Sequence, residues 1–337
     1  MTTRMLFVIG APRSGTTMLE RMLSAHSLIH GGPEPHLLTP LAHLGVWAKV
    51  DKAPYDHVLA AESQKLFVEQ LPGKQQDYWD ACRAYCDVLY GRYLEPSGKP
   101  ICLDKTPAYG LILPFLAKVF PDGKYVVLTR HPAAIFSSFA NSFFDGDFAQ
   151  AHRYNPILER YIPAMAWFLR QTEVPFFHVK YEDLVSAPEA WFERICGYIG
   201  VPFEPQAIEY GKEGGGADKP KGLGDPIGVT QHKRPSKSSL DKWPKEFAQD
   251  PGKLELLRKM VERIDPEDLR TIGYEPADLW KPMESVKAGK PPKPPKMTRY
   301  RLERKVIVRL RSQAQKGGLL RKLLEKTRLA CDVLLRD

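Results

Sequence analysis

Apolar residues follow two patterns along the chain, which are short continuous runs and longer stretches with helical spacing. The continuous runs cover residues 6–9, 28–30, 100–104, 124–128 and 174–180. Runs of this length are typical of strands buried on both faces of a parallel sheet. Helical spacing follows them, notably over residues 16–25, 107–120 and 188–200. This alternation predicts an α/β fold with a mostly parallel sheet flanked by helices.

The connection after the first predicted strand is rich in glycine and hydroxyl side chains. It reads Gly10-Ala11-Pro12-Arg13-Ser14-Gly15-Thr16-Thr17. Glycine permits a tight turn, and the free N–H groups at the start of the next helix favour an anion. The sequence therefore predicts a phosphate-binding loop, with a glycine turn that serves only packing as the structural alternative.

The loop lacks the lysine of nucleotide kinases and ATPases. Where that pattern places lysine, after the second glycine, this chain has Thr16, and the cation of the loop is Arg13. Triphosphate chemistry depends on that lysine, so an ATP-cleaving function is disfavoured.

These residues resemble the 5′-phosphosulfate loop of sulfotransferases that use 3′-phosphoadenosine-5′-phosphosulfate (PAPS). The resemblance covers about residues 6–243 and implies a fold related to P-loop nucleotide kinases. It also implies that Arg13, Ser14, Gly15, Thr16 and Thr17 contact the donor.

A second motif follows the predicted strand at residues 124–129. Arg130 comes directly after this strand, and Ser138 lies two helical turns further along. Both side chains could meet one phosphate that lies across the helix start. The spacing matches the 3′-phosphate-binding element of the same family.

Candidate catalytic residues follow two other strands. A carboxylate just after the second strand, Glu34, would lie beside the phosphate loop, because reactive groups gather at the carboxyl ends of parallel strands. In the tyrosylprotein sulfotransferase branch, a glutamate at this interval from the loop arginine acts as the base. Lys105, after the third strand, resembles the catalytic lysine of the family. Rival bases are His36 and His232, and a surface or capping role for Glu34 also remains open.

Further donor contacts follow from the resemblance alone. Tyr181 would contact the nucleotide, and Lys233, Arg234 and Lys242 would cover the 3′-phosphate and adenine. The alternatives are ordinary packing for the tyrosine and solvated surface positions for the three basic residues.

The domain organisation follows from composition. Residues 1–281 are expected to form the sulfotransferase domain, with a helical insertion at about 39–95 toward the acceptor. A Pro/Lys-rich linker would follow at 282–297, and a basic amphipathic helical tail at 298–337. The tail could bind a membrane surface, a partner or its own domain.

Charge and cysteine content limit the classes of function. Residues 281–337 carry 17 basic and 5 acidic residues, whereas the remainder carries 32 basic and 35 acidic ones. Nucleic-acid binding by the body is therefore not indicated. The five cysteines lack metal-binding spacing, and no signal peptide or membrane span is evident, so a cytoplasmic protein is expected.

The combined expectation is transfer of a sulfuryl group from PAPS to a hydroxyl acceptor, which could be a small molecule, a carrier-tethered group or a glycan. Glu34 would take the proton, and Lys105 and Arg13 would stabilise the bridging oxygen without a metal. The alternatives are a P-loop kinase and a non-catalytic nucleotide-binding protein that acts through its tail.

Overall fold

The structure is a computed structural model of the chain. It describes residues 3–32, 34, 38–42, 64–210 and 233–286, together with the single residues 306 and 323. Most of the predicted linker and tail, at 282–297 and 298–337, therefore lies outside the described residues.

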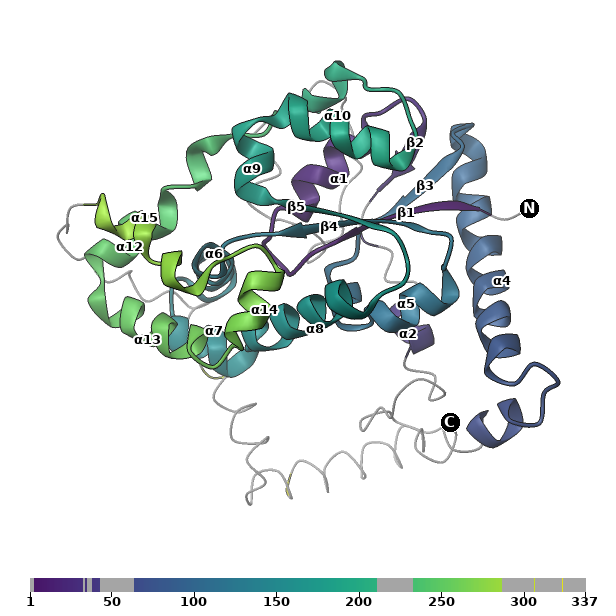
Figure 1. The fold of residues 1–337 in the computed structure, drawn as a ribbon, viewed down its shortest axis with the longest axis horizontal. Coiled ribbons are helices and arrows are strands. Elements are labelled where there is room, and N and C mark those ends of the chain that lie inside the picture. The colour runs from purple at the N-terminus through teal and green to yellow at the C-terminus, as the bar shows by residue number, and fades with distance from the viewer. Residues whose placement is uncertain are drawn as a thin grey trace.

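In the described part of the chain, five parallel strands form a central sheet (Figure 1). They are β1 Arg4–Ile9, β2 Ile29–Gly31, β3 Ile101–Asp104, β4 Lys124–Thr129 and β5 Phe176–Lys180, in the spatial order β2-β3-β1-β4-β5. Phe7 of β1 is in register with Asp104 of β3 and with Tyr125 of β4. The predicted parallel α/β fold is confirmed.

Helices cover both faces of the sheet (Figure 1). One face packs against α1 Thr16–Ser24, α9 Tyr181–Ser186 and α10 Pro188–Ile199. The other packs against α2 Leu38–Ala42, α4 Gln75–Leu94, α5 Leu113–Val119, α6 Pro132–Phe144, α7 Phe148–Tyr154 and α8 Ile157–Gln171. This second core is extended by α12 Lys242–Gln249, α13 Pro251–Val261, α14 Pro266–Thr271 and α15 Lys281–Glu284. The three central strands, β3, β1 and β4, are buried along almost their whole length, which explains their continuous apolar sequences, whereas the edge strands β2 and β5 are only partly buried.

The two cores divide the side chains of β1 between them. Leu6 and Val8 belong to the cluster under α1 and α10, and Phe7 and Ile9 belong to the larger cluster on the opposite face. Alternation along the strand therefore fixes the register, since a one-residue slip would exchange the two cores.

The expected insertion at about 39–95 contains α2 and α4 in its described part. Trp79, Cys82, Cys86 and Tyr90 of α4 are buried in the larger core. These four side chains therefore pack against the sheet.

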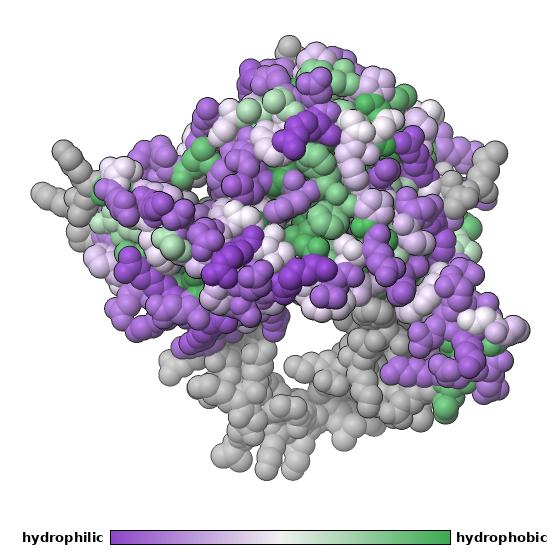
Figure 2. Space-filling view, in the orientation of Figure 1, coloured by the Kyte–Doolittle hydropathy of each residue, from purple (hydrophilic) through white to green (hydrophobic). Residues whose placement is uncertain are grey.

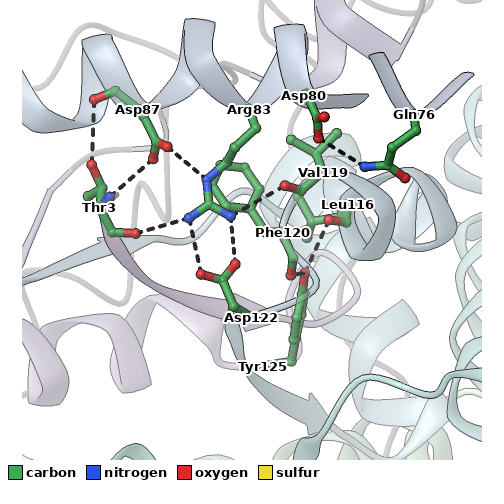
Figure 3. Close-up of polar contacts among 10 residues, drawn as sticks. All are labelled: Thr3, Gln76, Asp80, Arg83, Asp87, Leu116, Val119, Phe120, Asp122 and Tyr125. Carbon is green, nitrogen blue, oxygen red and sulfur yellow. Dashed lines mark hydrogen bonds and ion pairs between the residues drawn. The ribbon is translucent and has the colours of Figure 1, made fainter. Parts of the chain in front are cut away.

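Arg83 of α4 contacts residues near the amino ends of β1 and β4 (Figure 3). Arg83 of α4 donates from Nε to Asp87 Oδ2 at 3.0 Å and from Nη1 to Asp122 Oδ1 at 2.6 Å. Its Nη2 also donates to the Thr3 carbonyl oxygen at 3.4 Å. These contacts connect α4 to the residues that precede β1 and β4, and they stabilise the amino end of the sheet. The predicted site residues follow the strands at the opposite, carboxyl end.

The visible face of the molecule carries hydrophobic residues in small areas between hydrophilic ones (Figure 2). None of the helices in the described ranges is both long and apolar enough to cross a membrane.

Candidate active site

The predicted site residues meet at the carboxyl edge of the sheet. Arg13 follows β1, Glu34 follows β2, Lys105 follows β3, Arg130 follows β4, and Tyr181 follows β5. β1 lies at the centre of the sheet, with β3 on one side and β4 on the other. In such sheets the crevice outside the strand ends is the usual ligand site.

The phosphate loop has an unusual backbone at two positions. Gly15, at the start of α1, has φ of +98°, and Arg13 has φ of +71°. A positive φ is uncommon for a residue other than glycine and stores strain, often at functional sites. The turn is closed by a hydrogen bond from the Ser14 amide to the Ala11 carbonyl at 3.0 Å. The turn leads directly into the start of α1, where free N–H groups favour an anion.

Two arginines link the loop to the second motif. Arg13 Nε donates to Ser138 Oγ of α6 at 3.0 Å. Arg130 Nη1 donates to the carbonyl oxygen of Arg13 at 2.9 Å. The two elements expected to hold opposite ends of the donor are thus in direct contact, although Ser138 meets Arg13 here and not Arg130.

The Tyr181 ring packs against both the second motif and the phosphate loop. The Arg130 guanidinium lies 4.3 Å from the centre of the Tyr181 ring, a cation–π contact. The same ring packs against Gly15, and the Tyr181 hydroxyl is 2.6 Å from Ser239 Oγ of the 3₁₀ helix η4 Lys237–Ser239. Tyr181 begins helix α9.

Glu34 and Lys105 form an ion pair beside the loop. Lys105 Nζ contacts Glu34 Oε1 and lies 3.4 Å from Thr17 Oγ1. The Lys105 side chain is only 2 % exposed and that of Glu34 is 12 % exposed. A buried ammonium group needs a compensating charge, which Glu34 supplies. A predicted base and a predicted charge-stabilising group are therefore held together next to a hydroxyl of the phosphate loop.

Two buried donors in the site lack an acceptor. Among the described residues, Ser14 Oγ and Arg130 Nε are the buried side-chain polar atoms without a hydrogen-bond partner. Such atoms are rare in native proteins and call for an explanation. One atom lies in each of the two predicted phosphate elements, which fits a ligand with two anionic ends. The described ranges contain no group of three His, Cys, Asp or Glu side chains placed to hold a metal.

A buried carboxylate beside Lys105 was not singled out from the sequence. Asp104 ends β3 and accepts hydrogen bonds from the hydroxyls of Tyr90 at 2.5 Å, Tyr109 at 3.0 Å and Thr106 at 3.0 Å. Burial raises its pKa above the ordinary value, and these hydroxyl donors oppose the rise. The available signal was an acidic residue at the end of an apolar run, directly before the candidate lysine.

His131, next to Arg130, is held as a neutral ring. Its Nδ1 accepts from the Ala133 amide at 3.2 Å, and Nε2 donates to the Leu279 carbonyl at 2.9 Å. Only the neutral tautomer satisfies both contacts, and burial lowers the pKa of His131 to about 4. The ring also stacks on Trp243 at 4.4 Å between ring centres. His131 therefore caps the start of α6, directly after Arg130 of the second phosphate element.

Three other predicted donor contacts, Lys233, Arg234 and Lys242, have exposed side chains and stay predictions. Arg234 forms ion pairs of 3.0 Å with both Glu189 and Glu209. The rival bases His36 and His232 lie outside the described residues.

Comparison with known proteins gives the family. The profile of the sulfotransferase family matches residues 6–205. Nodulation protein NoeE of Sinorhizobium fredii is 26% identical over 80% of this chain and 65% of its own length. The protein-tyrosine sulfotransferase of Drosophila melanogaster is 23% identical over 81% of this chain and 52% of its own. This chain thus spans between half and two thirds of the length of these relatives.

Among solved structures, the sulfotransferase domain from the curacin biosynthetic pathway superposes with a TM-score of 0.49 and 21% identity. It covers 78% of this chain and 99% of the other. The family profile spans more than half of the chain and includes the phosphate loop, Lys105, Arg130 and Tyr181. The chain belongs to the sulfotransferase family.

Proposed function

We propose that this protein transfers a sulfuryl group from PAPS to a hydroxyl acceptor. The observation that carries the proposal is the pair of buried donors without partners, Ser14 Oγ and Arg130 Nε, one in each of two connected anion-binding elements. A ligand with an anionic group at each end accounts for both.

The donor would be held at two places. The amides at the start of α1, with Arg13, Ser14 and Thr17, would face the phosphosulfate end. Arg130 and Ser138 would face the 3′-phosphate, since a guanidinium and a hydroxyl are suitable partners for phosphate oxygens. When bound, PAPS supplies an activated sulfuryl group. Because that group carries less charge than a phosphoryl group, the cations of the chain can stabilise its transfer.

Glu34 and Lys105 would have separate roles in the transfer step. The Glu34 carboxylate would accept the proton of the acceptor hydroxyl. The Lys105 ammonium would stabilise negative charge on the leaving oxygen, an effect that is strongest where water is excluded, as it is around this buried side chain. Catalysis would then come chiefly from positioning and electrostatics.

The acceptor is proposed only as a hydroxyl-bearing molecule. The name of the Drosophila relative specifies protein tyrosine, which is a hydroxyl acceptor. A small molecule, a carrier-tethered group and a glycan all fit the same chemistry. The basic tail remains a candidate for contact with a membrane or a protein partner.

Ligand-dependent thermal unfolding tests the donor assignment. Adenosine 3′,5′-bisphosphate at about 100 times its Kd should stabilise the protein by about 2.7 kcal/mol without magnesium. Stabilisation by magnesium ATP alone would favour a kinase instead. No stabilisation by either, with lipid binding that is lost on deletion of residues 290–337, would favour the non-catalytic alternative.

Transfer itself can be measured by offering sulfur-labelled PAPS to a metabolite extract and identifying the labelled products. The Glu34→Gln variant should bind donor but turn over slowly. Normal turnover by this variant would move the base assignment to His36 or His232.

A further inference from the structure

The hydroxyl cluster around Asp104 links the two candidate catalytic residues. Asp104 directly precedes Lys105, and its carboxylate accepts from Tyr90, Thr106 and Tyr109. The Tyr109 hydroxyl also accepts a hydrogen bond from the Leu38 amide at 3.0 Å. Leu38 is the next described residue after Glu34, so Tyr109 contacts both the carboxylate beside Lys105 and the chain that follows Glu34.

The cluster is also deeply buried. Asp104 is 1 % exposed, Tyr90 4 % and Tyr109 0 %. The three hydroxyls come from α4, from the loop after β3 and from the 3₁₀ helix η2 Pro107–Leu111. A buried and fully satisfied polar network fixes a single arrangement, because each member would pay a desolvation cost if it moved away from its partner. Lys105 has a flexible side chain, so its head group depends on a fixed backbone.

The geometry points to Asp104 as a positioning residue, which acts through Tyr109 to hold Lys105 and the segment that carries Glu34 at the reacting position. This inference rests on the proposed function for the meaning of that position. Asp104 does not touch the reacting atoms. A misplacement of about 1 Å at such a site can cost about 100-fold in rate.

The test compares two buried tyrosines. Tyr109→Phe removes a hydroxyl that bonds to Asp104 and Leu38. Tyr125→Phe is the matched control, because its hydroxyl is equally buried and donates to the carbonyls of Leu116 at 3.1 Å and Phe120 at 2.7 Å (Figure 3). Each variant loses two hydrogen bonds from the same core, but only the first loses them beside Lys105.

The first measurement needs no activity. The full-length protein is treated with an amine-acylating reagent, and labelling of Lys105 is followed by peptide mass spectrometry relative to the exposed Lys65. Buried Lys105 should label slowly in the parent protein and in Tyr125→Phe. In Tyr109→Phe it should label at least about fivefold faster, because the loosened segment opens more often. Labelling of Lys105 in Tyr109→Phe at the rate of the control would overturn the inference, whatever the turnover.

The second measurement is the split between kcat and KM. Tyr109→Phe should lower kcat about tenfold with the KM for donor within about twofold, whereas Tyr125→Phe should change neither. Equal kcat values for the two variants would overturn the role of the cluster in catalysis. If the parent protein transfers no sulfate, the proposed function fails, and the labelling comparison alone decides whether the cluster positions Lys105.

Discussion

Replacement of Gly15 by alanine tests the packing that joins the phosphate loop to Tyr181. Gly15 has φ of +98°, and a Cβ atom there would lie 2.4 Å from Cδ2 and 2.7 Å from Cε2 of the Tyr181 ring. The left-handed backbone costs alanine about 1–2 kcal/mol, and overpacking adds about 1–3 kcal/mol. Gly15→Ala should therefore lower the free energy of unfolding by about 2–5 kcal/mol.

Gly98 provides the matched control. Its φ is +64°, and a Cβ atom built there has nothing within 4 Å. Gly98→Ala carries the backbone strain without the overlap, so it should cost only about 1–2 kcal/mol. The difference between the two variants isolates the contact with Tyr181.

Denaturant unfolding followed by tryptophan fluorescence measures both losses. A displaced Tyr181 ring would also move the Arg130 guanidinium that stacks on it. Titration calorimetry should therefore show adenosine 3′,5′-bisphosphate binding at least about tenfold weaker in Gly15→Ala and unchanged in Gly98→Ala. Equal stability losses and equal affinities would refute the argument that this glycine is required by the ring.

Three other changes test separate parts of the site. Arg130→Lys keeps the charge but loses the planar contact with Tyr181 and the forked hydrogen-bond geometry of the guanidinium. Calorimetry should therefore show adenosine 3′,5′-bisphosphate binding about 10–100-fold more weakly to this variant. An affinity within twofold of that of the parent would count against a phosphate contact. Glu34→Gln should lower kcat about 10²–10⁴-fold while leaving donor-product affinity nearly unchanged, and steady-state kinetics with unaltered kcat would exclude it as the base. His131 should stay neutral in the folded protein until the pH approaches 4, whereas in the unfolded chain it takes up a proton near pH 6.5. Its contribution to the free energy of unfolding, about 3 kcal/mol, is therefore complete above pH 6.5 and is lost as the pH falls toward 4. NMR titration of the imidazole, with unfolding of His131→Asn as the comparison, checks this, and a midpoint near 6.5 would contradict it.

The strands and the phosphate loop could be predicted because their signals are local. A continuous apolar run such as residues 6–9 is buried on both faces, and Gly15 of the loop has a positive φ, which favours glycine. The grouping of Arg13, Lys105 and Arg130 at one edge followed from the rule for parallel strand ends.

The partners of these residues could not be predicted in the same way. The bond from Arg13 to Ser138 joins positions 125 residues apart, and the bond from Leu38 to Tyr109 joins positions 71 apart. Such contacts depend on how helices cross the sheet, which no local pattern encodes. The ion pairs of Arg234 with Glu189 and Glu209 are contacts of the same kind, and its contact with the donor stays a prediction.

The most direct test is a crystal structure of the complex with adenosine 3′,5′-bisphosphate. We predict that the 5′-phosphate lies against Ser14 and the start of α1 and that the 3′-phosphate accepts hydrogen bonds from Arg130 and Ser138. A nucleotide bound elsewhere, with both phosphates outside hydrogen-bonding distance of Arg13 and Arg130, would contradict the account.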